Sequence, residues 1–330
     1  IGQVPRKDAL WLLRMNLNYR YGGSAGHGLY GVTPRNAGTR MRQAHPEYYA
    51  LYNGRRDSGH AANQCLSSSE LLKLTVHHAR WMFDYYHLPT LPIMPSDGYT
   101  ALCQCPLCEG KGSPDRPRDG QLADYVWNFI NGIAERIAKT HPDRYIIGQG
   151  YNTYKLPPRH MDRMHPNLIV NIKNGRQRSA TGAETARQLD ELRQSWLALT
   201  PNNLEISINA RYTKGGYLPP YFPHTMAQGL QRMKDCTQAE EINMPWGPDN
   251  LELNAPIVNH LTFYVMFRYY WNPEQDIDAL LAEYYNKFYG PAAEEMETFI
   301  EYCEANYTEL SNNKEKITQA LAHFETAQQQ

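Results

Sequence analysis

The sequence predicts an α/β fold of the TIM (β/α)8-barrel type, with additional helices towards its C-terminal end. Two observations predict this fold. Short apolar runs of strand length alternate with segments of helical periodicity over most of the 330 residues, which is typical of parallel strands joined by crossover helices. No glycine fingerprint of a nucleotide-binding fold stands directly at a strand-to-helix turn, which favours a barrel over a doubly wound sheet.

Seven strands are expected in the chain, and the first barrel strand is expected upstream of residue 1. The seven runs lie at residues 9–17, near 62, near 93, and at 144–151, 167–173, 203–210 and 237–244. Helices are expected from the serine cluster at 67–69 to about 86, and at about 121–140, 183–199, 225–234 and 255–270, with two or more beyond 276. We therefore expect one barrel domain over residues 1–300 and a helical extension over residues 301–330.

Composition and charge exclude several classes of partner. A chain with 42% hydrophobic and 20% charged residues can bury one large core. The net charge of −1 and the lack of a basic cluster argue against nucleic acid binding, and no apolar run reaches the roughly 18 residues of a membrane-spanning helix, so no membrane insertion is expected. The 24 Tyr and 6 Trp offer flat apolar faces with polar rims, which suit sugars.

A glycine-rich, aromatic stretch over residues 19–42 is too long and irregular for a simple connection. It is therefore a candidate functional loop. His27 lies in its middle and is a candidate substrate-binding residue, although an exposed loop histidine without such a role is the commoner case.

The segment LPIMPSDGYTALCQCPLC, residues 91–108, carries the strongest functional signal in the chain. Its apolar start reads as a buried strand that should end at Asp97-Gly98. Catalytic groups of a barrel lie at the C-terminal ends of the strands, so Asp97 is a candidate catalytic carboxylate. The alternative is that Asp-Gly forms only a turn.

Three cysteines follow Asp97 in a C-x-C-x-x-C run: Cys103, Cys105 and Cys108. This spacing lets three thiolates converge on one ion, and Cys65, expected at the tip of the preceding strand, is the candidate fourth ligand. Two disulfides are the alternative. We favour zinc, because this spacing with a distant fourth cysteine is a common tetrahedral layout and an ion would hold the loop beside Asp97. Four sulfur ligands would leave no position for a catalytic water, so the role of the ion would be structural. No cofactor is expected for catalysis.

A second carboxylate stands in the last predicted strand, where Glu240 and Glu241 are adjacent. Side chains alternate along a strand, so only one of the two can face the barrel mouth. We choose Glu241, since Asn243 shares its face and the loop that follows carries Trp246. A salt bridge at the sheet edge is the alternative. The remaining candidates for lining the substrate site are Tyr99, Tyr151 and Asn209.

Two carboxylates with aromatic residues suit the cleavage of a glycosidic bond. One acid protonates the leaving oxygen, and either a second carboxylate or the substrate's own acetamido group attacks the anomeric carbon. The sequence has neither a visible nucleophile elbow nor an H-E-x-x-H motif, so acyl transfer and metal-dependent hydrolysis lack support.

Three segments resemble a bacterial domain catalogued as of unknown function and associated with glycoside hydrolase family 163, the endo-acting β-N-acetylglucosaminidases of N-glycans. They are HPEYYALYNGRRDSGHAANQCLSSSELL, SDGYTALCQCPLC and WNPEQDIDALLAEYYNKFYGPAAEEM, and the likeness runs from about Leu10 to Ile300. The resemblance implies a TIM-barrel glycosidase, usually with an accessory domain and an upstream first strand. In relatives, an aromatic-Asp-Tyr stretch often stands where this chain has Ser207-Ile208-Asn209.

The cysteine pattern is also similar to the zinc cluster of family 42 β-galactosidases. In that family the thiol run follows a strand that ends in Asn-Glu, the glutamate being the general acid. The matching pair here is Ser96-Asp97.

We therefore expect a glycoside hydrolase that acts on β-linked, N-acetylhexosamine-containing glycans, with an oligosaccharide or polysaccharide as its substrate. Asp97 and Glu241 would be the acid/base and stabilising pair. The alternative is a glycan-binding barrel that has lost its activity at Ile208. A secreted or periplasmic location is expected, although the sequence does not begin with a signal peptide.

Overall fold

The computed structural model describes residues 26–33, 39–57, 59, 62–173, 183–200, 204–209, 221–234, 239–243, 260–310 and 312–330. At residues 39, 183, 205–209 and 239–243 the description covers the backbone alone. The first predicted strand, at residues 9–17, lies outside the described residues.

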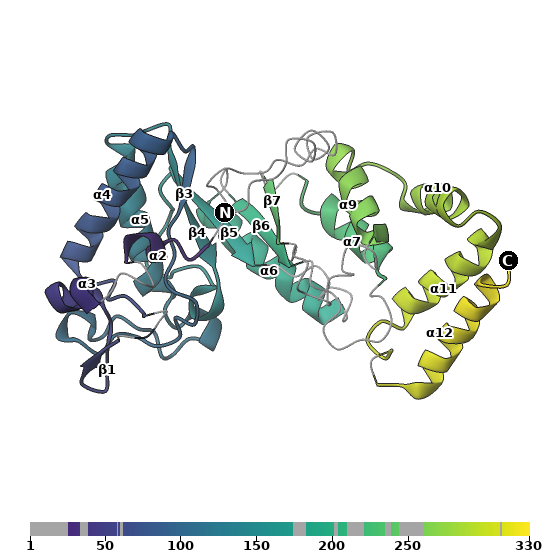
Figure 1. The fold of residues 1–330 in the computed structure, drawn as a ribbon, viewed down its shortest axis with the longest axis horizontal. Coiled ribbons are helices and arrows are strands. Elements are labelled where there is room, and N and C mark those ends of the chain that lie inside the picture. The colour runs from purple at the N-terminus through teal and green to yellow at the C-terminus, as the bar shows by residue number, and fades with distance from the viewer. Residues whose placement is uncertain are drawn as a thin grey trace.

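A five-stranded parallel sheet forms the centre of the molecule, in the order β3-β4-β5-β6-β7 (Figure 1). The strands are β3 (Thr90–Pro92), β4 (Tyr145–Gly150), β5 (Leu168–Lys173), β6 (Leu204–Asn209) and β7 (Ala239–Asn243). The predicted α/β class with a parallel sheet is confirmed. Within the described residues β3 and β7 are the two edges of this sheet, and its closure into a barrel stays a prediction.

The strand expected near residue 62 is not part of this sheet. Among the residues described there, Gln64 forms an isolated antiparallel bridge with Tyr49. A small hairpin precedes it, β1 (Leu51–Tyr52) and β2 (Arg55–Arg56), joined through Asn53 and Gly54 with φ of 48° and 75°. Such left-handed conformations are what a tight Asn-Gly hairpin turn requires.

The helices follow the predicted order closely. They are α2 (Leu29–Val32), α3 (Thr39–Ala44), α4 (Ser69–Tyr86), α5 (Ala123–Ala138), α6 (Ala183–Leu199), α7 (Pro223–Gln231), α9 (His260–Trp271), α10 (Ile277–Tyr289), α11 (Ala293–Ala305) and α12 (Lys314–Ala327). Short 3-10 turns occur at Pro46–Tyr48, Pro106–Cys108, Arg118–Gly120, Asn152–Tyr154 and Gly290–Ala292. None of the described helices is long and apolar enough to cross a membrane.

Helix α4 has both the serine cap and the helical spacing of apolar residues from which the sequence predicts it. Ser68 caps its first turn by accepting a hydrogen bond from the Leu71 amide, at 3.2 Å. The buried positions Leu71, Val76 and Phe83 recur at helical spacing, and His87 ends the helix in the left-handed conformation, with φ of 52°.

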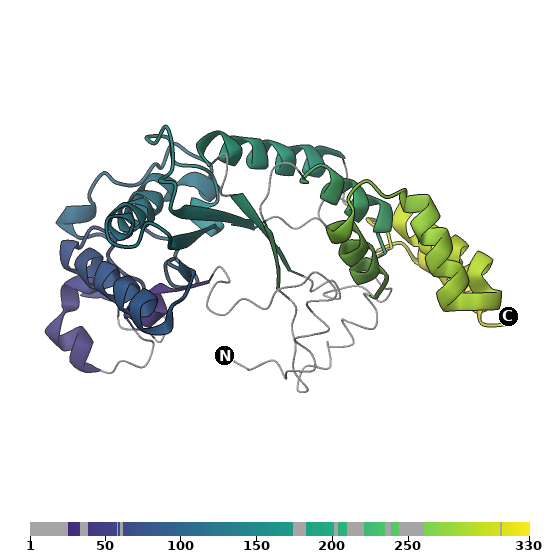
Figure 2. The ribbon, with the colours of Figure 1, turned by 90° about the horizontal axis from the view of Figure 1, so that it is seen from above.

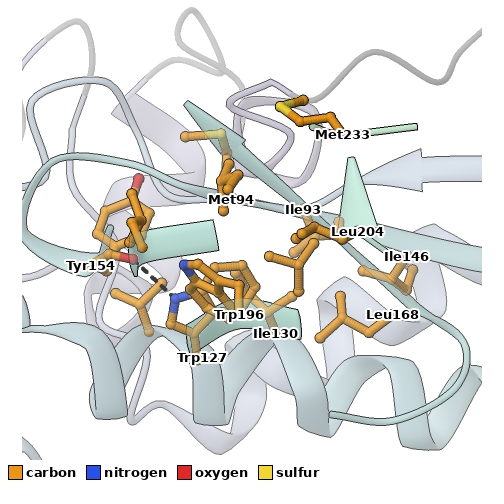
Figure 3. Packing of buried hydrophobic residues seen from close by; sticks show 14 of the residues in the cluster. Ile93, Met94, Trp127, Ile130, Ile146, Tyr154, Leu168, Trp196, Leu204 and Met233 are labelled. Carbon is orange, nitrogen blue, oxygen red and sulfur yellow. Dashed lines mark hydrogen bonds between the residues drawn. The ribbon is translucent and has the colours of Figure 1, made fainter. Parts of the chain in front are cut away.

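The core lies between the sheet and helices α5 and α6 (Figure 3). Trp127 of α5 and Trp196 of α6 meet edge to face, with ring centroids 4.8 Å apart. A Cβ at Gly148 of β4 would lie 2.6 Å from the Trp127 ring, so only glycine lets that ring lie against the strand. The Trp127 indole N–H donates to the Tyr154 carbonyl at 3.0 Å, which fixes the segment after β4.

The C-terminal helices extend away from the sheet, with α10, α11 and α12 at the end of the molecule opposite to α4 and α5 (Figures 1 and 2). Helices α11 and α12 pack against each other, and Phe299 and Phe324 meet with ring centroids 5.3 Å apart. The division expected between residues 300 and 301 falls inside α11, which is one continuous helix.

Candidate functional site

Asp97 lies in a tight turn a few residues after β3, at the C-terminal edge of the parallel sheet. The Tyr99 amide donates to the Ser96 carbonyl at 3.2 Å, and Gly98 takes the left-handed conformation with φ of 79°. The Asp97 side chain is 60% exposed. Ligands of open parallel sheets and barrels bind at this edge, so the carboxylate is accessible at the place where chemistry is expected.

His27 contacts Asp97 from a segment that is distant in sequence. Its Nε2 lies 3.6 Å from Asp97 Oδ1. Its Nδ1 lies 2.6 Å from the Pro95 carbonyl, and because a carbonyl only accepts, Nδ1 carries the proton in this contact. The imidazole is thereby oriented with its second nitrogen towards the carboxylate. His27, predicted as a substrate-binding residue, is thus placed beside Asp97.

Two tyrosines complete the immediate surroundings of Asp97. The Tyr151 hydroxyl, from the residue after β4, donates to Asp97 Oδ1 at 3.4 Å. Burial and the neighbouring Asp97 carboxylate raise the pKa of Tyr151, so its hydroxyl remains a donor. The Asp97 amide donates to the Tyr30 hydroxyl at 2.9 Å. Tyr30 was not predicted, and its position in the glycine-rich loop was the only signal for it.

A third tyrosine, Tyr154, lies beneath this group and is fully buried. Burial raises the pKa of Tyr154 well above its usual range, and the nearby Tyr151 and Asp97 raise it further. Its hydroxyl has no hydrogen-bond partner among the described residues.

Tyr99 does not line the site, contrary to the prediction. Its side chain is buried, and its hydroxyl donates to the Gln64 carbonyl at 2.9 Å. Its own carbonyl accepts from the Thr153 hydroxyl at 3.0 Å. The reason is the turn at Gly98, which reverses the chain so that the residue after it points into the core.

Helix α2 brings His27 and Tyr30 to Asp97 because Gly28 allows a close approach to β3. A Cβ at Gly28 would lie 1.7 Å from the Pro92 carbonyl oxygen. The Leu29 amide donates to the Met94 carbonyl at 3.2 Å. Residues 26–31 read GHGLYG, which has the G-x-G-x-x-G spacing, but α2 is only four residues long and the glycine serves helix-to-strand packing.

The predicted residues on β6 and β7 are placed by backbone register alone. Asn209 pairs with Asn243, and Ser207 pairs with Glu241. Lys173 of β5 pairs with Ser207, so Glu241 occupies the same row of the sheet as Lys173. Trp246 lies outside the described residues.

On the sheet face shared by the positions of Lys173 and Glu241, polar residues on β4 and β5 occupy the neighbouring register row. Gln149 and Asn171 are both buried, and the Gln149 amide donates to Asn171 Oδ1 at 3.2 Å. Asn171 is in register with Glu205 of β6. Glu240, by contrast, is in register with Ile206, on the alternate face.

The four predicted cysteines form one cluster. The described cysteines are all free thiols, so the structure contains no disulfide among them. The sulfur of Cys65 lies 3.6 Å from that of Cys105 and 3.5 Å from that of Cys108, and the four sulfurs all lie within 4.8 Å of one another. All four side chains are buried. The cysteine spacing therefore located a real side-chain cluster.

Polar groups contact two of the four sulfurs, while burial raises the pKa of the Cys103 thiol. The Leu51 amide of β1 donates to the Cys103 sulfur at 3.2 Å, and the Tyr125 hydroxyl of α5 lies 3.2 Å from the Cys108 sulfur. A hydrogen bond from the Cys65 thiol lowers the pKa of Cys108 to about 4, and the same contact raises the pKa of Cys65. In the absence of an ion, the thiolate is therefore favoured at Cys108 and disfavoured at Cys65 and Cys103.

The geometry of the cluster fits a tetrahedral metal ion. Four sulfurs about 2.3 Å from a zinc ion stand roughly 3.8 Å apart, whereas a disulfide requires about 2.05 Å. The Cys105 and Cys108 sulfurs, at 3.6 Å, are close to the former distance. The cluster could hold a metal ion such as zinc, bound by Cys65, Cys103, Cys105 and Cys108.

Comparisons with known proteins place the chain in a family. No curated protein matches it significantly. Among solved structures it is similar to one described as a GH138 enzyme targeting pectin rhamnogalacturonan II, with 11% sequence identity and a TM-score of 0.26. That superposition covers 89% of this chain, which spans 41% of the length of that enzyme.

Residues 12–301 match the family described as Domain of unknown function (DUF4838). This range covers most of the 330 residues. The expected link to glycoside hydrolase family 163 stays a prediction. The chain belongs to the DUF4838 family.

Proposed function

We propose that this domain is a glycoside hydrolase acting on β-linked glycans that contain N-acetylhexosamine. The observation that carries the proposal is the surroundings of Asp97. Its accessible carboxylate follows β3 at the C-terminal edge of the sheet and is contacted by the Tyr151 hydroxyl and by His27. A positioned carboxylate with aromatic neighbours is what sugar binding and general acid catalysis require.

Asp97 would act either as the acid that protonates the leaving oxygen or as the group that orients a substrate acetamide. Both roles require the carboxyl group to stay accessible while its rotamer is restrained. The Gly98 amide and the Tyr151 hydroxyl both donate to Asp97 Oδ1, at 3.0 and 3.4 Å. Its second oxygen, Oδ2, would then face the substrate.

Glu241 remains the proposed second carboxylate, and its use depends on curvature of the sheet. Its strand, β7, is the edge opposite to β3. Four interstrand spacings of about 4.8 Å would separate the two strands by roughly 19 Å in a flat sheet. We propose that the sheet closes into a barrel, which would bring these strand ends together across the mouth. Glu205 on β6 is the next carboxylate to test.

We also propose that the cysteine cluster holds one zinc ion with a structural role. Four thiolate ligands leave no open coordination position, so the ion supplies cohesion and no chemistry. Cys103 follows Asp97 by six residues, and the ion would therefore anchor the segment that leaves the Asp97 turn. A secreted or periplasmic location belongs to the same proposal.

The test is a screen of fluorogenic β-glycosides and released N-glycans with the wild type and the Asp97→Asn and Glu241→Gln variants. We expect the wild type to hydrolyse N-acetylglucosaminides and the Asp97→Asn and Glu241→Gln variants to lose this activity. Asp143→Asn is the matched control and should keep it, because that exposed aspartate lies just before β4, at the N-terminal ends of the strands.

The same screen separates catalysis from glycan binding alone. Asn209 occupies a β6 position near the end of the strand, and the preceding Ile208 has no carboxylate. Binding of released N-glycans in calorimetry without any turnover would support a glycan-binding domain that has lost its activity. Neither binding nor turnover would reject both functions.

A further inference from the structure

We propose that Gln64 is a positioning residue that holds the Asp97 turn against helix α2 and links both to the four-cysteine centre. Gln64 is fully buried, 0% exposed, and directly precedes the metal-ligand candidate Cys65. It belongs to no strand of the described sheet. Any effect of Gln64 on the Asp97 turn must therefore act through its hydrogen bonds and not through pairing within the parallel sheet.

Those hydrogen bonds reach the Asp97 turn from two directions. The Ser96 hydroxyl lies within donor distance of Gln64 Oε1, at 3.1 Å, and of the Ala62 carbonyl, at 2.8 Å. The Tyr99 hydroxyl donates to the backbone carbonyl of Gln64 at 2.9 Å. Gln64 thus binds the residues on both sides of Asp97-Gly98, and the turn between them is held at two points.

A third hydrogen bond reaches helix α2. Gln64 Nε2 donates to the Thr33 hydroxyl at 2.9 Å, and that hydroxyl donates to the Leu29 carbonyl at 3.0 Å. Helix α2 carries Tyr30 and follows His27, which contact the Asp97 turn directly. One buried amide therefore fixes the two segments whose separation sets the contact between Asp97 and His27.

The connection to the cysteine centre runs through the backbone. The Cys65 amide donates to the Tyr48 carbonyl at 2.9 Å, and the Leu51 amide donates to the Cys103 sulfur. Any movement of Cys65 is passed to Gln64 as the adjacent residue. A metal ion that holds Cys65 in place would therefore also hold the turn that presents Asp97.

The network should tolerate loss of the Gln64 side chain without unfolding. Ser96 keeps the Ala62 carbonyl and Thr33 keeps the Leu29 carbonyl as partners. Gln64→Met preserves the length and volume of the side chain but removes both of its polar groups. Its effect should therefore be local loosening.

The test is hydrogen–deuterium exchange at the amides of Leu29, Asp97 and Tyr99, read without substrate. Gln64→Met should speed their exchange by about fivefold or more, the scale of losing the hydrogen bond to Thr33 together with the Ser96 bond that is shared with Ala62, while far-ultraviolet circular dichroism and metal content stay at wild-type values. Gln64→Glu, read at a pH low enough to keep the buried carboxyl protonated, keeps an oxygen acceptor for Ser96 and a donor for Thr33, and should restore much of the protection at Asp97 and Tyr99.

The matched control is Asn167→Leu. Asn167 is also a buried amide, and its Nδ2 donates to the Pro142 and Arg144 carbonyls at 2.8 Å, at the other end of the sheet. This variant should lose stability without faster exchange around Asp97. Unchanged exchange in Gln64→Met, or equal effects in both variants, would overturn the positioning role.

A double-mutant cycle tests the link to the cysteine centre. If Gln64 transmits the constraint, Cys105→Ser and Gln64→Met together should speed exchange at Asp97 by less than the product of their separate effects. Chelation of the metal from wild type and Gln64→Met replaces the cysteine variant if the latter does not fold. Fully multiplicative effects would overturn the link. The inference rests on the proposed function only for the catalytic role of Asp97. Because hydrogen exchange is measured without turnover, the positioning role of Gln64 and the proposed function can fail separately.

Discussion

The two ends of the molecule are held together by different kinds of interaction. Around the cysteine cluster, directional contacts dominate, with four buried sulfurs and the fully buried polar side chains of Gln64 and Ser96. At the other end, helices α9 to α12 pack through aromatic rings. Tyr264 of α9 and Tyr284 of α10 meet with ring centroids 5.0 Å apart, and Phe299 of α11 meets Phe324 of α12 at 5.3 Å.

This difference indicates where the positions of side chains are most tightly constrained. Hydrogen bonds and metal coordination fix angles as well as distances, whereas apolar packing of helices tolerates small shifts at little cost. The directional interactions surround Asp97, where a displaced carboxylate would matter. The side chains around Asp97 are therefore more constrained in direction than the rings that pack between the C-terminal helices.

Directional contacts also occur in the C-terminal region, such as the hydrogen bonds from Arg268 to Tyr264 and from Tyr302 to Gln319. In another of them, His224 of α7 lies between two carboxylates. Its Nδ1 is 2.7 Å from Glu304 Oε2, and its Nε2 is 3.1 Å from Asp278 Oδ1. The hydrogen bond to Glu304 is the main reason that the pKa of His224 is raised to about 9. This contact joins α7 to α10 and α11, and it makes that end sensitive to pH.

The largest expected effect is that of Cys105→Ser. Loss of one thiolate should remove the metal and destabilise the protein by more than about 4 kcal/mol, because metal binding energy is also folding energy. Elemental analysis and thermal melts measure both quantities. Cys303→Ser is the matched control, since Cys303 is equally buried in α11 but lies outside the cluster. Equal metal content in the two variants would contradict the assignment.

Gly28→Ala should have the next largest effect, about 1–3 kcal/mol, because the added Cβ meets the Pro92 backbone and α2 must move away from β3. Urea denaturation measures it. Gly31→Ala is the control: its Cβ would lie 3.3 Å from the His78 side chain, which can shift. If both alanines behave alike, the close approach of α2 is not a constraint.

Glu304→Gln should cost about 1–2 kcal/mol near pH 6, because it weakens the contact with His224. A raised pKa means that the contribution of His224 is complete below its ordinary value of 6.5 and is lost as pH rises through about 9. The urea midpoint of Glu304→Gln should therefore lie below that of the wild type at pH 6, and the two midpoints should approach each other at pH 10. Glu301→Gln, on the exposed face of the same helix, should show no such convergence.

The sequence was most informative where local chemistry decides the structure. The C-x-C-x-x-C spacing located three of the four clustered cysteines on one short segment, and the cap at Ser68 located the start of α4. Strands β4 and β5 were predicted because buried parallel strands contain continuous apolar runs, here Ile146-Ile147 and Leu168-Ile169-Val170. These signals need no knowledge of distant contacts.

The parts that could not be predicted depend on contacts distant in sequence. Tyr99 was expected to line a groove because it neighbours Asp97, but its hydroxyl is bound by Gln64, 35 residues earlier. Tyr30 reaches Asp97 only because Gly28 lets α2 approach β3. The segment near residue 62 was expected to be a strand because strands and helices alternate along the chain, yet Gln64 pairs with Tyr49 outside the parallel sheet.

The central claim, that Asp97 is a functional and not a structural carboxylate, is tested most directly by measuring turnover and thermal stability of Asp97→Asn together. Asp97 is 60% exposed, so its replacement should leave the melting temperature nearly unchanged. We predict that cleavage of a β-N-acetylglucosaminide falls by at least about a hundredfold, the scale of losing positioned acid–base help. A variant that retains wild-type turnover, or that loses activity only in proportion to folded protein, would contradict the account.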